Sequence, residues 1–83
     1  MKIHHIKLNR KYADAVLDGL KKFEIRYNDR KYKLYDLVQF VVIDDNGEKI
    51  EHDLNYCTWI ITYILSDFIG LSENYVAFSI QLL

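Results

Sequence analysis

The chain has 83 residues, of which 51% are hydrophobic and 14% aromatic, so we expect one small globular domain and exclude a disordered or tandem-repeat protein. Eleven basic and 12 acidic side chains give a formal net charge of −1, which alone indicates neither a nucleic-acid-binding protein nor an acidic tail. The charges are unevenly divided: residues 1–34 hold ten basic and four acidic side chains, whereas residues 35–83 hold one basic and eight acidic.

The first predicted elements are a strand and a helix. Met1 to Leu8 alternates in the manner of a short strand. Asn9 is a suitable N-cap for a helix over Arg10 to Asp18, whose apolar residues recur at helical spacing. Gly19 supplies the left-handed conformation that ends many helices.

A second strand is predicted over Lys22 to Tyr27, where the sequence returns to a period of two. One face is formed by Phe23, Ile25 and Tyr27, and the other by Lys22, Glu24 and Arg26. This strand therefore has one apolar and one charged face.

The second half of the chain is rich in β-forming residues. The pattern predicts strands at residues 37–43, 48–56, 59–65 and 75–83, an Asn-Gly hairpin turn at 44–47, and one helical turn at 66–70. About six short strands and one helix in the N-terminal half indicate an α+β, mainly β fold, closed into a small mixed barrel that leaves few open edges.

The segment from Gly19 to Arg26 reads Gly-x-Lys-x-x-Glu-x-Arg, which resembles the signature of the ASCH domains, a branch of the PUA-like β-barrels. Further similarity lies in His4-x-Ile6-Lys7, in Asn28-Asp29-Arg30, and in the segment from Thr62 to Val76, in the order typical of a small bacterial and phage-associated ASCH-like family of unknown function. The resemblance implies one PUA-like domain over residues 1–83, with the motif lining a cleft beside the helix.

The residues around this motif are typical of a nucleic-acid surface. Between Arg26 and Tyr35, four cations alternate with three tyrosines, a composition suited to phosphates and to unpaired bases. We therefore expect an RNA-binding module whose binding residues are Lys7, Lys21, Glu24, Arg26, Asn28, Arg30, Lys31 and Tyr32. In the alternative interpretation, the tyrosines fill the ends of the barrel and the cations are solvated.

The charged pair on the second predicted strand has two interpretations. Glu24 and Arg26 are two residues apart, so their side chains point the same way about 6.6 Å apart. They could face a ligand in a cleft, or they could form a buried ion-pair network with Lys21 or Asp29. The spacing fits both.

Catalysis is the second candidate function. Some ASCH-like proteins are amidohydrolases that use the motif lysine with a hydroxyl nucleophile, and the corresponding strand position here is Glu24. The resemblance thus permits a small hydrolase acting on a nucleoside or RNA through Lys21, Glu24 and His4, with pKa values shifted by burial. A third candidate is a protein-interaction domain that uses the acidic second half.

No cofactor, metal or membrane segment is expected. Adjacent His4 and His5 point to opposite faces of a strand and cannot chelate one ion together. The uncharged stretch at residues 54–66 is shorter than the roughly 20 residues that span a bilayer. A single cysteine, Cys57, and the absence of a leader-like N-terminus favour a cytoplasmic location.

Finally, the uneven charge distribution predicts two surfaces of opposite sign. The basic patch would contain Lys7, Lys21, Arg26, Arg30 and Lys31. The acidic face would contain Asp44, Asp45, Glu48 and Glu51. We expect these surfaces to lie on opposite sides of the domain.

Overall fold

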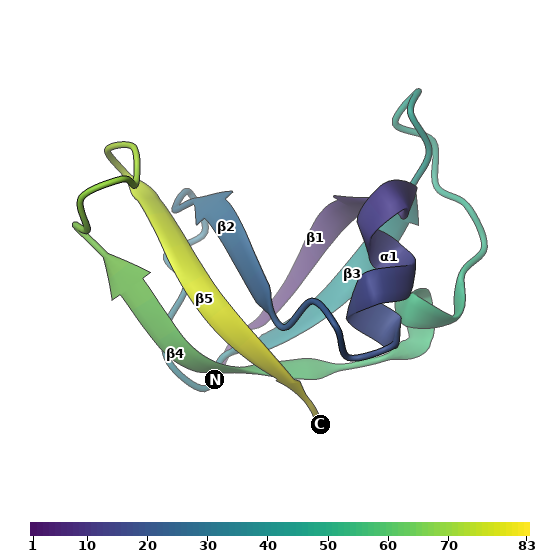
Figure 1. Cartoon of the computed structure of the whole chain (residues 1–83). Helices are drawn as coiled ribbons and strands as arrows, with labels where there is room; N and C mark the ends of the chain where they lie inside the picture. The colour runs from purple at the N-terminus through teal and green to yellow at the C-terminus, as the bar shows by residue number, and fades with distance from the viewer.

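A computed structural model describes all 83 residues, which form one curled sheet with one α-helix (Figure 1). The elements in chain order are β1 (Ile3–Asn9), α1 (Arg10–Leu17), β2 (Phe23–Tyr27), β3 (Leu37–Ile43), the 3-10 helix η1 (Asp53–Tyr56), β4 (Trp59–Ser66) and β5 (Tyr75–Leu82). The strand order is β1-β3-β4-β5-β2, with β1 parallel to β3 and the other neighbours antiparallel. This confirms a small, mainly β fold.

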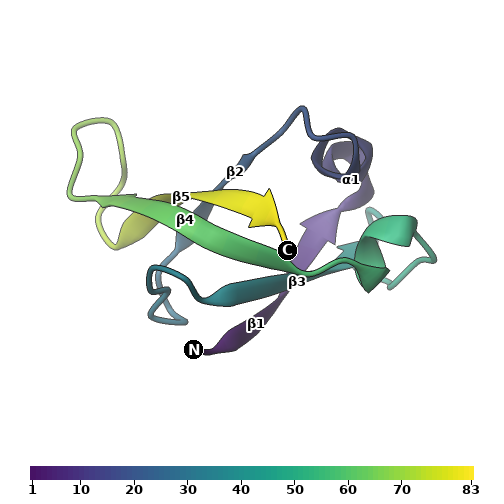
Figure 2. The same ribbon diagram turned by 90° about the horizontal axis from the view of Figure 1, so that it is seen from below.

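The sheet curls into a half-barrel that stays open between its two edge strands. Figures 1 and 2 show one arm made of β4, β5 and β2 and another made of β1 and β3, with β2 facing β1 across the open side. The core lies inside the curl, where Ile6, Phe40, Ile61 and Phe78 are almost fully buried. The half-barrel therefore buries one face of each strand and leaves a gap between β1 and β2.

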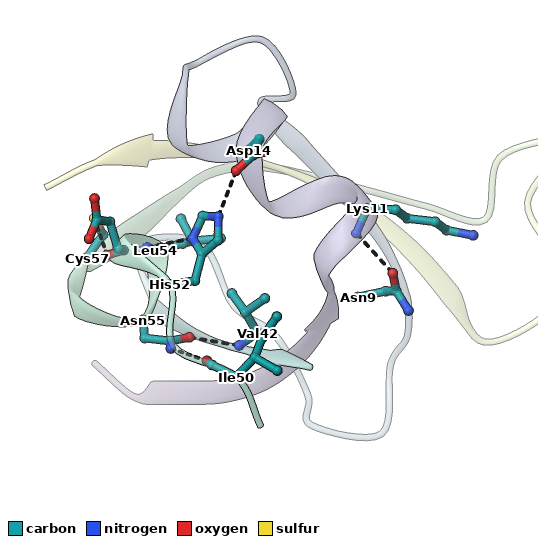
Figure 3. Close-up of polar contacts among 10 residues, drawn as sticks. Asn9, Lys11, Asp14, Val42, Ile50, His52, Leu54, Asn55 and Cys57 are labelled. Atoms are coloured by element: carbon teal, nitrogen blue, oxygen red, sulfur yellow. Dashed lines mark hydrogen bonds and ion pairs between the residues drawn. The ribbon is translucent and has the colours of Figure 1, made fainter. Parts of the chain in front are cut away.

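The N-terminal elements follow the predicted pattern. Residues of β1 alternate between exposed and buried, with His4, Ile6 and Leu8 facing the core. The side chain of Asn9 accepts a hydrogen bond from the backbone N–H of Lys11 at 3.0 Å, which confirms the N-cap (Figure 3). The helix ends at Leu17, one residue earlier than predicted, because Asp18 already forms its C-cap.

Helix α1 covers the β1–β3 arm. It contacts β1, β3 and η1, and its fully buried residues are Ala13 and Val16. Gly19 then turns the chain toward β2 with a φ of 76°, as its position after the helix predicted. None of the helices has the length and apolar character that crossing a membrane requires.

The strand predicted over residues 48–56 is wrong. Only Lys49 bridges to Ile43 before the chain leaves the sheet, and residues 53–56 form η1 instead. The Asn55 side chain takes the place of a strand partner: its Oδ1 accepts from the N–H of Val42 at 2.8 Å, and its Nδ2 donates to the carbonyl of Ile50 at 2.9 Å (Figure 3). The sheet consequently has five strands rather than six.

The helical turn predicted over residues 66–70 is also wrong. Asp67 has a φ of 53° and Gly70 a φ of 99°, both outside the right-handed helical region. Asn74 follows with a φ of 66°, so this β4–β5 connection uses three left-handed residues. Asp and Asn tolerate this conformation better than other side chains, which explains why the segment forms a non-helical loop.

Candidate functional site

The gap between β1 and β2 contains a hollow of about 520 Å³. The hollow is lined by the end of β1, the first turn of α1, Lys21 in the connection between α1 and β2, and β2 itself. Lys7, Lys21 and Arg26 contribute the cations, and Tyr12 and Phe23 contribute half-exposed rings. The structure thus brings together the three charged residues of the motif, Lys21, Glu24 and Arg26, and a lysine from β1.

Two smaller hollows continue from this one. The first, of about 230 Å³, also contains Lys7 and Arg26 and adds Arg30 and Tyr32. The second, of about 310 Å³, also contains Arg30 and adds Lys31. We call the three together the basic cleft; its cations are Lys2, Lys7, Lys21, Arg26, Arg30, Lys31 and Lys33. Because neighbouring hollows share residues, these cations form one continuous surface.

Positive charge dominates this surface. Its seven cations are accompanied by three carboxylates, those of Glu24, Asp29 and Asp36. Two of the three, Glu24 and Asp36, are buried and hydrogen-bonded within the protein. The charge accessible to a ligand is therefore mainly cationic, and a polyanion is the ligand that it would attract.

Strand β2 turns its charged face toward the core and its apolar face toward solvent, the reverse of the arrangement usual in globular proteins. Glu24 is 2% exposed and faces the core, whereas Phe23, Ile25 and Tyr27 are each about half exposed. In the register with β5, Glu24 lies opposite Phe78, a core residue. The predicted alternation is confirmed, and the charged face is the one that points inward.

Glu24 is the shared counter-ion of two cations. Its Oε2 contacts Lys21 Nζ, and its Oε1 accepts hydrogen bonds from Arg26 Nη2 at 2.7 Å and Nε at 3.0 Å. Lys21 Nζ also donates to the carbonyl of Phe23 at 2.7 Å. This is the buried network of the structural interpretation, and the carboxylate has little free surface for a ligand.

The cations held by Glu24 nevertheless reach the cleft. The side chains of Lys21 and Arg26 are 20% and 25% exposed, and both line the hollow. Arg26 uses Nε and Nη2 for Glu24, so Nη1 remains without a protein partner. Glu24 therefore positions two cations whose outer sides stay accessible.

Aromatic rings flank the Lys21 cation. Its Nζ lies 5.0 Å from the ring centroid of Phe23 and 5.6 Å from that of Tyr12, within the range of cation–π attraction. The Tyr12 ring is 43% exposed and the Phe23 ring 51%, so each presents surface to solvent. A flat aromatic ligand could stack on these rings beside a positive charge.

The ring of Tyr32 is packed in the core and offers little exposed surface on which a base could stack. It is 7% exposed, with its ring centroid 4.7 Å from that of His4 and 4.8 Å from that of Phe78. Burial raises the pKa of Tyr32 above its usual 10.0, and the neighbouring cations Arg26 and Arg30 oppose this increase. Only part of Tyr32 reaches the basic cleft, so the interpretation in which this tyrosine fills the barrel fits its position.

His4 lies apart from the other two candidate catalytic residues. It is 1% exposed, and its Nε2 donates to Asp36 Oδ2 at 2.9 Å. His4 belongs to the start of β1, whereas Lys21 and Glu24 lie beside the end of β1, near Lys7. Lys21 and Glu24 line the largest hollow of the basic cleft together, whereas His4 does not line it.

Asp36 is the centre of a second buried polar cluster. Its carboxylate accepts from His4 and from the backbone N–H groups of Lys2 at 3.2 Å and Lys33 at 3.1 Å. Burial is the strongest single influence and acts to raise the pKa of Asp36, but these hydrogen bonds outweigh it and hold the pKa below its usual 3.8. The cluster joins β1 to the Arg30–Asp36 loop and thereby fixes one end of the basic cleft.

Asn28 and Lys31 shape the loop after β2. The Asn28 side chain accepts from the backbone N–H of Tyr32 at 3.0 Å, and the backbone N–H of Asn28 donates to the Asn74 carbonyl at 2.8 Å. Lys31 is exposed and has a φ of 52°. Asn28 lines a hollow of about 940 Å³ beside the β4–β5 loop, which shares Tyr27 and Asp29 with the basic cleft, so Asn28 has a turn-forming position at the margin of the cleft.

The acidic turn borders the helix instead of lying wholly apart from the cleft. Asp45 Oδ2 lies 3.7 Å from Arg10 Nη2, and Asp45 Oδ1 accepts from Asn9 Nδ2 at 3.1 Å. Asn9 itself lines the largest hollow of the basic cleft. The expectation that acidic and basic surfaces lie on opposite sides is therefore not met at Asp45.

Sequence reasoning missed the cleft residues Tyr12 and Lys2. Lys33 was counted among the four cations between Arg26 and Tyr35, but not among the expected binding residues. The sequence signal that could have indicated Tyr12 is its position in the first turn of α1, three residues after the N-cap Asn9. No cluster of three or more His, Cys, Asp or Glu side chains is arranged to hold a metal ion.

Comparison with known proteins places the chain in a family. The profile of a family described as a domain of unknown function (DUF3850) matches residues 3–80. The chain belongs to this family. All cations of the basic cleft except Lys2 lie within the part that matches DUF3850.

The chain is also similar to a phage protein, the "Uncharacterized 12.9 kDa protein in GpA 3'region" of Escherichia phage P2. The two are 38% identical over 74 residues. The similarity covers 77% of this chain and 65% of the phage protein, so the chain spans slightly less than two thirds of that relative.

Proposed function

We propose that this DUF3850 domain binds RNA in the basic cleft between β1 and β2. The observation that carries the proposal is the continuity of the cations: Lys7 and Arg26 belong to two adjoining hollows, and Arg30 joins the second hollow to the third. Lysine and arginine along a groove attract the phosphates of a nucleic-acid backbone. The resemblance of the Gly19–Arg26 motif to ASCH domains supports the same function and a PUA-like classification of the half-barrel.

Single-stranded RNA suits this cleft better than a duplex. The largest hollow, at about 520 Å³, has the dimensions of a small-ligand site. The half-exposed rings of Tyr12 and Phe23 beside Lys21 would receive unpaired bases, while Arg26 Nη1 and Lys7 would contact phosphates. We also propose that the domain acts in the cytoplasm of a bacterium or phage-infected cell, in keeping with the similar phage protein.

The proposal predicts salt-dependent RNA binding that weakens when cleft cations are removed. For Arg30→Ala and Lys31→Ala, the slope of log K against log salt is expected to become shallower by up to about 0.7 for each lost phosphate contact. Fluorescence anisotropy of a labelled single-stranded RNA in a salt series measures this slope.

The matched control is Lys49→Ala, because Lys49 is an exposed cation outside the basic cleft. It should leave affinity and slope unchanged. Equal losses in Lys49→Ala and Arg30→Ala would mean that binding follows net charge rather than the cleft.

The same incubation separates binding from hydrolysis. We expect the RNA to be recovered intact, because Lys21 and Glu24 are paired with each other and His4 is held by Asp36. RNA cleavage that disappears in Lys21→Ala would instead favour the hydrolase.

A further inference from the structure

The outer face of the β2–β5–β4 arm is apolar and uncovered. Its exposed residues are Phe23, Ile25, Tyr27, Tyr63, Leu65 and Tyr75. The strand registers place these residues in rows across one surface. Phe23 and Tyr63 both pair with Ser79 of β5. Ile25 and Leu65 both pair with Ala77, and Tyr27 pairs with Tyr75. Helix α1 contacts β1, β3 and η1, on the other arm, and leaves this surface bare (Figure 1). We call these six residues the outer patch.

We propose that the outer patch is the contact surface for a second copy of this chain, forming a symmetric dimer. Most of the outer patch lies on the opposite face of β2 from Glu24 and Arg26, but Phe23 and Ile25 also line the basic cleft, so the two surfaces meet at these two residues. The experiment below uses protein without RNA and therefore tests the dimer separately from the proposed RNA binding.

Charge favours a second copy over other occupants. The strand positions that form this face, including Ala77 and Ser79 between the larger residues, carry no charged side chain. Apart from Lys21, whose Nζ lies 5.0 Å from the ring centroid of Phe23 at one margin of the patch, a nucleic acid or a strongly charged protein would find no complementary charge on it. A two-fold contact places the patch against itself without opposing like charges, and the net charge of −1 causes little repulsion between copies.

The area of the outer patch fits a weak dimer. Four half-exposed aromatic side chains and two aliphatic ones offer on the order of 500 Å² of apolar surface, at the upper end of what single monomers expose. Two copies face to face would bury about 1,000 Å², the lower limit for a specific interface. The dissociation constant is accordingly expected in the micromolar range.

Two further features favour contact through the face rather than through the free edge of β2. Glu24 and Arg26 point inward from this edge strand, a device that discourages the addition of another strand. On the face, Tyr27 and Tyr75 form an edge-to-face pair with centroids 5.6 Å apart. Such a pair is a rigid aromatic anchor of the kind found at the centres of interfaces.

Sedimentation equilibrium of the full chain tests the proposal over a range of about 5 µM to 1 mM, which spans the expected micromolar constant. The mass should rise from monomer to dimer. Raising the salt concentration should leave the dissociation constant unchanged or lower it, since the contact is apolar. A chain that stays monomeric throughout would overturn the proposal and point to a different protein as occupant.

Matched variants locate the contact. Ile25→Lys and Tyr63→Lys should each raise the dissociation constant by about 30-fold or more, the effect of losing an interface hot spot. Tyr56→Lys is the control, because Tyr56 is 75% exposed on η1, outside the outer patch. A dimer that Tyr63→Lys and Ile25→Lys leave intact, while both remain folded by circular dichroism, would also overturn the proposal.

Discussion

Replacing Glu24 with glutamine is expected to lower the free energy of unfolding by about 3–5 kcal/mol, because it removes the charge from a buried ion-pair network. Glu24 is 2% exposed and holds both Lys21 and Arg26. Without its charge, two partly buried cations remain close together. For a domain of this size the loss is a large part of the total stability. Chemical denaturation at neutral pH, followed by circular dichroism, measures it.

The matched control is Glu73→Gln, the same substitution at an exposed carboxylate with no hydrogen bond in the structure. It should change stability by less than about 0.5 kcal/mol. If Glu24→Gln instead melts like the wild type and binds polyanions more tightly, Glu24 faces solvent in the cleft, and the network is not a structural necessity.

Replacing Asp36 with asparagine should destabilise the fold by about 3 kcal/mol. The carboxylate accepts three hydrogen bonds, from His4 Nε2 and from the N–H groups of Lys2 and Lys33. Asparagine keeps the size but turns an NH₂ group toward these donors and leaves part of them unpaired. Urea denaturation at neutral pH measures the loss, and Asp29→Asn, an exposed carboxylate in the neighbouring loop, is the control.

Asp36 also makes stability depend on pH. Its folded-state pKa lies below 3.8, so its contribution is complete above the unfolded-state pKa, near 4, and is lost as the pH falls through the folded-state value. Denaturation of the wild type between neutral pH and pH 3 should therefore show a loss of stability that is smaller in Asp36→Asn. Identical pH profiles for the two proteins would contradict this role.

Local sequence signals predicted the N-terminal elements. Asn9 caps α1, Gly19 ends it in a left-handed conformation, and β1 alternates as its sequence requires. Each of these features depends on residues that are close together in the chain. The prediction for the region after β3 was wrong because the deciding contact joins residues far apart in the chain. The Asn55 side chain accepts a hydrogen bond from the N–H of Val42, and no pattern within residues 48–56 reveals this contact.

The candidate site was predicted only in part, because its arrangement also depends on contacts between residues far apart in the chain. Alternation assigned Glu24 and Arg26 to one face of a strand, but it cannot say which face turns inward. The curl of the sheet decides that, because it brings β2 opposite β1 and places Lys7 beside Arg26. His4 lies at the other end of β1 and does not line the hollow that contains Lys21.

Chemical-shift mapping tests RNA binding by the basic cleft most directly. Uniformly ¹⁵N-labelled protein is titrated with a short single-stranded RNA at low salt, and amide shifts are followed along the chain. We expect the largest changes around Lys7, Lys21, Arg26 and Arg30, with little change around η1 at residues 53–56, which does not line the cleft. Absence of shifts at saturating RNA, or shifts centred outside the cleft, would contradict the proposed function.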